Sequence, residues 1–349
     1  MPNKRVITYA EALNEALLEE MGRDSRIFTY GIDVADHLRT FGTNKGVLEK
    51  FGAERCFSTP LSEEALAGFG LGAAIAGLRP INVHMRIDFL LLAMNQIANM
   101  ISSYRYGSGG KIKVPLVIRA IIGRGWGQAY QHSKTLHSIF SHIPGLKVVM
   151  PTTPKDAKGL LITALRDENP ILFIEHRWLY YQSGDVPQKS FTIPLGKGNI
   201  LRKGKDITIV ATSWMNVEAF KAAEILEGAG VSVEIVDPRT ITPLDTDIIV
   251  KSVKKTKYCL VADNDWEFCG FGAEVAAQVS KECFGVLKAP VERIGFAPVP
   301  CPTTRNLENE FYPNSGKIIR KIEKMLKLKP IDLSHEQFYT YEHKFKGPF

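Results

Sequence analysis

Two acidic residues stand at the start of the glycine-rich stretch 62–77 and are the first candidates for chemistry. Ser62 is a good helix N-cap, so Glu63 and Glu64 should fall in the first helical turn. Acids at this position commonly do no more than complement the helix dipole, an effect of about 0.3 to 1 kcal/mol. A carboxyl group shielded from water can instead keep its proton and hydrogen-bond a basic ring nitrogen. Both interpretations of Glu63 remain open at this point.

The body of the same helix carries small residues at every fourth position. Gly68, Gly72 and Ala76 follow one another along one face, although a glycine costs up to about 1 kcal/mol relative to alanine in a helix interior. We therefore expect another backbone or a flat ligand to approach this face closely. Either neighbour would partly bury Glu63.

An aromatic residue and a histidine are the next candidates. Phe89 begins the helix expected after the strand at 80–84. It is either a core aromatic or a stacking platform for a heteroaromatic ring, to which Glu63 would supply the in-plane hydrogen bond. His132 follows the glycine loop 123–127 and is placed to act as an acid or base at the sheet edge. A satisfied, partly buried ring is the alternative.

Two other kinds of site are disfavoured by spacing. The loop Gly123-Arg-Gly-Trp-Gly127 follows an apolar strand, but it lacks the third glycine and the later acid of a dinucleotide-binding turn. His132, His137 and His142 are five residues apart. This interval is about 500° on a helix, so no two rings share a face as zinc ligands would.

Composition excludes several classes of protein. Of the 349 residues, 45% are hydrophobic and 23% charged, which is ordinary for a globular protein. The net charge of +7 is spread along the chain without a basic run interleaved with aromatics, so we expect no nucleic-acid partner. No apolar run is long enough to span a membrane. Five scattered cysteines and the absence of an apolar N-terminal signal segment favour the cytoplasm.

The order of the expected elements predicts an α/β protein with two domains, each a mostly parallel sheet flanked by helices. We place the first domain at 1–190, a linker at 191–206, the second domain at 207–330 and a C-terminal extension at 331–349. Strands are expected at 26–31, 80–84, 114–122, 146–150, 171–175, 207–211, 231–236 and 258–262. Helices are expected from the capping box at Thr8-Glu11, from Ser62, and at 88–104, 154–166, 217–227, 245–253, 272–283 and 315–328.

Several spaced segments carry a resemblance to a known family. They are Thr-Pro-Leu-Ser-Glu at 59–63, the stretch 67–80, Gln-His-Ser at 131–133, and the stretches 142–151, 156–160 and 298–302. In this order they resemble the β subunit of 2-oxo acid dehydrogenase E1 components, of the pyruvate and branched-chain type, in the transketolase-like superfamily. The resemblance runs from about Arg5 to Leu328. It implies a pyrimidine-binding domain followed by a transketolase C-terminal domain.

The resemblance also implies a cofactor and residue roles. The family uses thiamine diphosphate for the oxidative decarboxylation of a 2-oxo acid. Glu63 aligns with the glutamate that hydrogen-bonds the aminopyrimidine ring, and Phe89 aligns with the aromatic that packs on it. His132 aligns with the histidine that acts during acyl transfer to a lipoyl group.

The resemblance implies partners as well. The chain contains no Gly-Asp-Gly sequence, so the diphosphate and its Mg²⁺ would be held by a separate E1 α subunit in an α2β2 heterotetramer. The acyl group would pass to a lipoylated E2 acyltransferase. A structural potassium ion (K⁺) is bound in the family at positions that correspond here to Leu116, Ala164, Leu165, Asp167 and Asn169.

The chain departs from the family near the expected site, and this leaves alternatives. Ile32 stands where relatives commonly carry an acid, Asn95 replaces an aspartate, and Arg86, Trp126 and His137 are bulkier or more charged than expected. A split transketolase or acetoin-type subunit is the second hypothesis, and a non-catalytic scaffold subunit is the third. The side chain of the 2-oxo acid is not fixed by this sequence.

Overall fold

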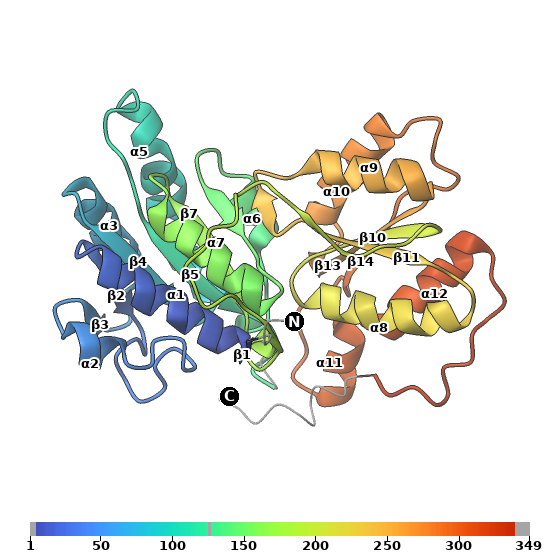
Figure 1. Ribbon diagram of the computed structural model, residues 1–349, viewed down its shortest axis with the longest axis horizontal. Helices are drawn as coiled ribbons and strands as arrows, with labels where there is room; N and C mark the ends of the chain where they lie inside the picture. The colour runs from blue at the N-terminus through green and yellow to red at the C-terminus, as the bar shows by residue number, and fades with distance from the viewer. Residues whose placement is uncertain (1–4, 125–126, 339–349) are drawn as a thin grey trace. The chain divides into compact units, whose positions relative to one another are not determined.

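The computed structural model describes residues 5–124 and 127–338, which divide into two compact units (Figure 1). The first unit contains the described residues up to 124 together with 134–195. The second contains 127–133 and the residues from 196 onward. Each unit has its own sheet flanked by helices, so the expected α/β fold with two mostly parallel sheets is confirmed. The segment 127–133 groups with the second unit although it was expected with the first.

The sheet of the first unit is parallel throughout and runs in the order β6-β7-β5-β4-β2-β3. Both β5 and β7 are buried along their whole length, as is typical of strands covered on both faces. The strands are β2 (Ile27–Gly31), β3 (Cys56–Ser58), β4 (Arg79–His84), β5 (Val117–Ile122), β6 (Lys147–Val149) and β7 (Ile171–His176).

Two long helices, α1 (Tyr9–Arg23) and α7 (Pro154–Arg166), pack side by side on the first unit (Figure 1). The expected capping box opens α1: the Thr8 hydroxyl accepts from the Glu11 amide at 3.2 Å, and the Glu11 carboxylate accepts from the Thr8 amide at 2.8 Å. α7 has its expected bounds because Thr153 caps it and a proline occupies its first turn.

The glycine-rich helix α3 (Glu63–Ile75) is approached closely at Gly70, not at Gly68 or Gly72. A Cβ atom on Gly70 would lie 2.4 Å from the Tyr30 hydroxyl oxygen and 3.1 Å from a Leu116 methyl carbon. A Cβ atom on Gly72 would meet nothing within 4 Å. Within this chain no backbone comes close to Gly68 or Gly72, so the expected approach to that face stays a prediction about a ligand or a second polypeptide. The Tyr30 hydroxyl fills the space at Gly70 because it donates to the Leu66 carbonyl at 2.7 Å.

Alanine at the two glycines should therefore have opposite effects on stability. We expect Gly70→Ala to lower the free energy of unfolding by about 1 to 3 kcal/mol, because the buried Tyr30 ring has to move. Gly72→Ala should raise it by up to about 1 kcal/mol, because the methyl group enters open space and alanine favours the helix. Urea denaturation of the two variants measures both changes. Equal effects would show that Gly70 is not in close contact.

The helix expected at 88–104 is broken into four short segments. They are α4 (Ile87–Leu90), the 3-10 turn η1 (Leu91–Ala93), the π-helix η2 (Gln96–Ile101) and α5 (Ser102–Gly107). Apolar periodicity predicts a helix here but does not distinguish these three hydrogen-bonding patterns.

The sheet of the second unit has the order β14-β13-β10-β11-β9, with β9 antiparallel at the edge and the other pairs parallel. α8 packs against α12, and α9 packs against α10. The strands are β9 (Asn199–Arg202), β10 (Ile207–Ala211), β11 (Val233–Asp237), β13 (Cys259–Trp266) and β14 (Glu292–Phe296). The helices are α8 (Trp214–Gly228), α9 (Thr246–Thr256), α10 (Phe271–Glu282), α11 (Arg305–Phe311) and α12 (Ser315–Leu326).

Two stretches expected to lie outside the domains pack on the second unit instead. β9 lies within 191–206 and pairs with β11. Beyond α12, Ile331 and Leu333 contact the core of this unit. The Lys221 ammonium donates to the Gln337 carbonyl and lies 5.1 Å from the centre of the Phe338 ring. The remainder of the expected extension, 339–349, lies outside the described residues.

The remaining elements are short. They are β1 (Val6–Thr8), which pairs with β8 (Ser183–Asp185), the strand β12 (Thr240–Thr242), the helices α2 (Val47–Phe51) and α6 (His137–Ser141), and the turns η3 (Ala129–Gln131) and η4 (Arg177–Leu179).

A buried ion pair connects two strands of the first sheet to a loop. The Arg119 guanidinium donates to both oxygens of Glu175, at 2.5 and 2.9 Å, and both side chains are almost fully buried. Arg119 also donates to Thr43 at 2.8 Å and to Asn44 at 3.1 Å. The pair therefore holds the loop before α2 against β5.

Two buried histidines should make the fold sensitive to acid. Burial lowers the pKa of His84, at the end of β4, to about 4, and that of His176 to about 3. An unfolded histidine takes up its proton near pH 6.5, so the unfolded state binds more protons between pH 6.5 and the folded pKa. The free energy of unfolding therefore falls as the pH drops through this window, by on the order of 3 kcal/mol for His84.

Urea midpoints measured between pH 8 and pH 4 test this expectation. His84→Phe should make the decline shallower, because one of the two buried histidines with a lowered pKa is gone. The control His335→Asn, at an exposed position, should leave it unchanged. A decline that is equally steep in His84→Phe and in the unsubstituted chain would contradict the assignment.

Candidate functional site

Glu63 is buried at the first position of α3. The side chain is 7% exposed, and it makes no hydrogen bond or ion pair with any other residue in the described part of the chain. Ser62 is the N-cap, but its hydroxyl makes no cap hydrogen bond, so that part of the sequence interpretation is wrong. A carboxyl group that is shielded from water and has no protein partner is available to bind a ligand as an acid or a base.

The segments that follow Phe89 pack against the same helix. Phe89 lies in α4 and is half-buried, and both η1 and η2 contact α3. The Gln96 side-chain amide donates to Glu64 at 2.8 Å, which ties η2 to the first turn of α3. The segments that directly follow the helix of Phe89 therefore pack on the helix that begins with Glu63, while a contact between Phe89 and Glu63 stays a prediction. Gln96 was not singled out for this role from the sequence, because its partner Glu64 is 32 residues away in the chain.

A buried arginine, Arg86, connects α4 to the end of β5. Arg86 caps the start of α4 and is 7% exposed, and its guanidinium donates to the Gly123 carbonyl at 3.2 Å. The end of β5 is thereby joined to the helix that carries Phe89. The carboxyl ends of parallel strands are the usual place for ligands in such sheets.

His132 belongs to a different unit from Glu63 and Phe89. It follows η3, is partly exposed, and its amide donates to the Ala129 carbonyl at 3.3 Å. The Tyr312 hydroxyl, also in the second unit, donates to the neighbouring Ser133 carbonyl at 3.4 Å. The proximity of His132 to the other two residues therefore stays a prediction.

The residues expected to bind potassium gather at the C-terminal end of α7. Asp167 caps this helix, and its carboxylate pairs with the Lys147 ammonium at 2.5 Å. A backbone carbonyl oxygen that accepts one hydrogen bond keeps a second lone pair, which a potassium ion could use. The Leu116 carbonyl accepts from Ile171 at 2.9 Å, and the Ala164 carbonyl accepts from Asp167 at 3.3 Å.

An arginine competes for two of the same carbonyls. The Arg79 guanidinium donates to the Leu165 carbonyl at 2.9 Å and to the Asp167 carbonyl at 2.5 Å. The Asn169 side-chain carbonyl accepts from Arg105 at 2.8 Å. A potassium ion would have to share these oxygens with two guanidinium groups. Arg79 was not recognised from the sequence, where it appears only as the arginine before a strand proline.

Other sites can be set aside for the described residues. In 5–124 and 127–338 no three His, Cys, Asp or Glu side chains are grouped so as to hold a metal ion. All five cysteines lie in the described part of the chain, and none of them forms a disulfide bond there. Among the described helices, none is long and apolar enough to cross a lipid bilayer.

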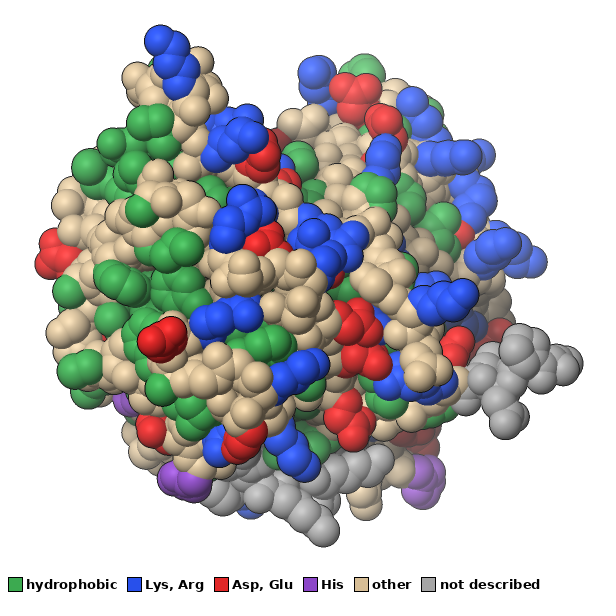
Figure 2. Space-filling view, turned by 60° about the vertical axis from the view of Figure 1, so that its left-hand side comes forward, with side chains coloured by type: hydrophobic (Ala, Val, Ile, Leu, Met, Phe, Trp, Pro, Cys, Tyr) green, Lys and Arg blue, Asp and Glu red, His purple; other side chains and the backbone are tan. Residues whose placement is uncertain are grey.

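The outer face of α3 is apolar and uncovered. Phe69 is 50% exposed and Leu92, in η1, is 62% exposed. Figure 2 shows apolar side chains gathering on the side of the first unit that carries α3 and α5. Gly72 lies on the exposed surface of α3. This face has the composition of a protein interface.

Comparisons with known proteins agree with this two-unit architecture. Residues 5–182 match the family model "Transketolase, pyrimidine binding domain", and residues 196–318 match "Transketolase, C-terminal domain". A solved "Split gene transketolase, inactive beta4 tetramer" has a TM-score of 0.73, covering 93% of this chain and 99% of its own, at 24% sequence identity. That likeness concerns the fold.

Three curated relatives are more similar in sequence. The "Pyruvate dehydrogenase E1 component subunit beta" of Rickettsia felis is 42% identical, covering 91% of this chain and 98% of its own. The "2-oxoisovalerate dehydrogenase subunit beta" of Bacillus subtilis is 41% identical, covering 90% and 96%. The "Acetoin:2,6-dichlorophenolindophenol oxidoreductase subunit beta" of Cupriavidus necator is 41% identical, covering 93% and 98%.

These matches define a transketolase-type protein of two domains. The chain belongs to the family of 2-oxo acid dehydrogenase E1 β subunits, which are components of oxidoreductases. The resemblance inferred from the sequence motifs is thereby confirmed.

Proposed function

We propose that this chain is the β subunit of a thiamine-diphosphate-dependent E1 that oxidatively decarboxylates a 2-oxo acid. The buried carboxyl group of Glu63, which has no hydrogen-bond or ion-pair partner among the described residues, carries the proposal. A carboxyl group in this state fits the aminopyrimidine end of the coenzyme, since the ring nitrogens and the amino group offer it hydrogen bonds. When bound, thiamine diphosphate supplies an electron sink for loss of carbon dioxide.

Each residue of this chain has a limited task in the proposal. Glu63 holds or exchanges a proton with the pyrimidine ring. Phe89 presents an aromatic face for that ring, and its helix is held by Arg86. His132 donates or accepts a proton during acyl transfer to a lipoyl group of an E2 acyltransferase.

Part of the site is assigned to a second polypeptide. The described residues contain no cluster suited to Mg²⁺, and the chain has no Gly-Asp-Gly sequence. We assign the diphosphate and Mg²⁺ to an E1 α subunit in an α2β2 heterotetramer, with the apolar face of α3 in the assembly. Five cysteines without a disulfide bond among the described residues fit a reducing compartment, so we assign the complex to the cytoplasm.

Reconstitution tests the proposal. The chain is mixed with its α subunit, thiamine diphosphate and Mg²⁺, and carbon dioxide release is measured from pyruvate and from branched-chain 2-oxo acids. Release that requires both subunits and the coenzyme is expected. Coenzyme-dependent thermal stabilisation without decarboxylation of any 2-oxo acid would favour a scaffold subunit instead.

A second candidate function has support of its own. The similarity to β subunits named for acetoin is nearly the same as the similarity to those named for pyruvate. The two functions differ in substrate. Turnover of acetoin with dichlorophenolindophenol, in the absence of turnover of 2-oxo acids, would favour the acetoin-type enzyme.

We also propose that potassium binds at the C-terminal end of α7. If so, the melting temperature should be a few degrees higher in potassium chloride than in choline chloride of equal ionic strength, because a ligand of the folded state stabilises it. Differential scanning fluorimetry measures the difference. Equal melting temperatures would show that the Arg79 guanidinium suffices for the Leu165 and Asp167 carbonyls.

A further inference from the structure

A groove follows helix α12 on the second unit, and none of the residues discussed for the coenzyme contributes to it. Its first hollow has a volume of about 540 Å³ and is lined by four cations of α12, Lys317, Arg320, Lys321 and Lys324. A second hollow of about 420 Å³ shares Lys321 and Lys324 and continues to Lys288 and Lys327. We call the two hollows together the α12 groove.

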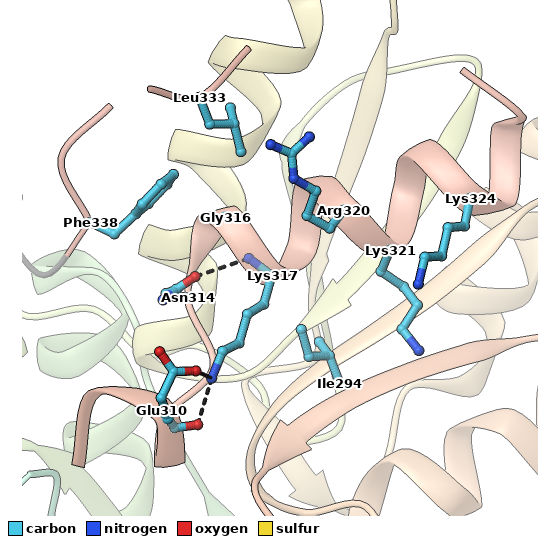
Figure 3. A pocket seen from close by; sticks show the side chains of 10 residues that line it. All are labelled: Ile294, Glu310, Asn314, Gly316, Lys317, Arg320, Lys321, Lys324, Leu333 and Phe338. Atoms are coloured by element: carbon cyan, nitrogen blue, oxygen red, sulfur yellow. Dashed lines mark hydrogen bonds and ion pairs between the residues drawn. The ribbon is translucent and has the colours of Figure 1, made fainter. Parts of the chain in front are cut away.

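The two ends of the α12 groove differ in chemistry. At the N-terminal end of α12, the Phe338 ring packs on Gly316, where an added Cβ atom would lie 3.0 Å from the ring. Leu333 lies on the same side of α12 as Phe338, whereas Ile294 lies beside Lys317 and Lys321, and Glu310 and Asn314 are polar members of the lining (Figure 3). Toward the C-terminal end the lining is mainly basic, with Lys324 on the helix, Lys327 at its C-cap and Lys288, and Glu292 is its one acidic member.

The charges of the groove are only partly neutralised. Lys317 donates to the Glu310 carbonyl at 2.6 Å, Arg320 pairs with Glu323 at 2.8 Å, and Lys321 pairs with Glu292 at 3.0 Å. The ammonium groups of Lys288, Lys324 and Lys327 make no hydrogen bond or ion pair within 5–124 and 127–338. A row of unpaired cations beside an apolar hollow complements an anionic partner.

We propose that the α12 groove binds an acidic peptide segment of a partner protein, with one bulky apolar side chain anchored near Phe338. The helix has 12 residues, which corresponds to about 18 Å. An extended peptide covers this length with about five residues. This length favours a peptide over a small anion. The apolar end receives the anchor, and the acidic residues that follow face Lys324, Lys327 and Lys288.

A defined peptide tests the proposal with the full-length chain. The probe is a fluorescein-labelled peptide of one leucine followed by five alternating aspartates and glutamates, and binding is measured by fluorescence anisotropy. We expect saturable binding that weakens as the salt concentration rises. The same peptide with asparagine and glutamine in place of the acids should bind at least about tenfold more weakly.

A matched pair of variants locates the binding site. Lys324 and Lys254 both lie in the last turn of an exposed helix of the second unit, but only Lys324 lines the groove. Lys324→Glu should weaken peptide binding about tenfold, while Lys254→Glu, with the same change in net charge, should have little effect. Melting temperatures of both variants confirm that they are folded.

Three results would overturn the proposal. The first is equal binding by the two variants, and the second is equal affinity for the acidic and the neutral peptide. The third is evidence for a different occupant. Binding to phosphatidylserine vesicles without binding to the peptide would indicate a membrane surface, and self-association that is lost in Lys324→Glu but not in Lys254→Glu would indicate a second copy of this chain. None of these measurements involves the coenzyme, so a failure here is distinguishable from a failure of the proposed function.

Discussion

Replacing Glu63 by glutamine should reduce carbon dioxide release by the reconstituted enzyme by at least about 100-fold, the effect typical of a lost positioned acid or base. Glutamine keeps the size and hydrogen-bonding geometry of the side chain but cannot exchange a proton. The loss should appear in kcat, since the coenzyme keeps its contacts with the α subunit. Initial rates measured at saturating 2-oxo acid, thiamine diphosphate and Mg²⁺ give the effect.

The neighbouring residue provides a matched control. Glu64 lies in the same turn of α3 but is exposed, and its carboxylate accepts from Gln96. Glu64→Gln should retain turnover within about threefold, because it alters one exposed contact. Co-elution with the α subunit shows whether either variant still assembles. Unchanged turnover in assembled Glu63→Gln would refute the role that we assign to this acid.

Replacing His132 by glutamine should separate two stages of the reaction. Acyl transfer to a lipoylated E2 domain should fall by about 10²- to 10⁴-fold, because a positioned proton donor is lost. Decarboxylation measured with dichlorophenolindophenol as electron acceptor should change less than about tenfold, since this assay bypasses the lipoyl group. The ratio of the two rates is the measurement.

His142 is the matched control for this experiment. It lies at the exposed C-cap of α6, and His142→Gln should leave both rates unchanged. If His132→Gln instead lowers both rates equally, the histidine acts before or during decarboxylation. If neither rate changes, His132 is a partly buried ring without a chemical role.

Caps, turn residues and apolar patterns in the sequence predict the helices and strands whose ends and buried faces are set by residues within the same segment. α7 illustrates this, because a threonine cap, a proline in the first turn and an apolar stripe define it without reference to the rest of the fold. β5 and β7 are likewise recognisable as continuous apolar runs.

Short strands of three or four residues with a single pairing partner were not predicted. β9 is stabilised by pairing with β11, and β8 by pairing with β1, and periodicity within one segment carries no information about such pairs. The same limit applies to the glycines of α3. Their spacing indicates that something comes close, but only the fold places the Tyr30 hydroxyl against Gly70.

The residues of the candidate site also fall into those that the sequence predicts and those that only the tertiary structure reveals. Glu63, Phe89 and His132 are predictions from residue type and family motifs, whereas Gln96, Arg86 and Arg79 acquire their contacts through tertiary structure. A lone arginine or glutamine has no sequence signature for the carbonyl or carboxylate that it meets.

The π-helical turn at Gln96–Ile101 has a consequence for how the chain tolerates insertions and deletions. A π-turn accommodates one residue more than the α-helical ladder on either side of it. Deleting one residue there would tighten the turn to ordinary α-helical spacing while the flanking segments keep their orientation. The π-helical turn, which contacts Glu64 through Gln96, can thus lose one residue without redirecting Phe89. A deletion inside α3 would instead rotate Glu63 by about 100° relative to the rest of its helix.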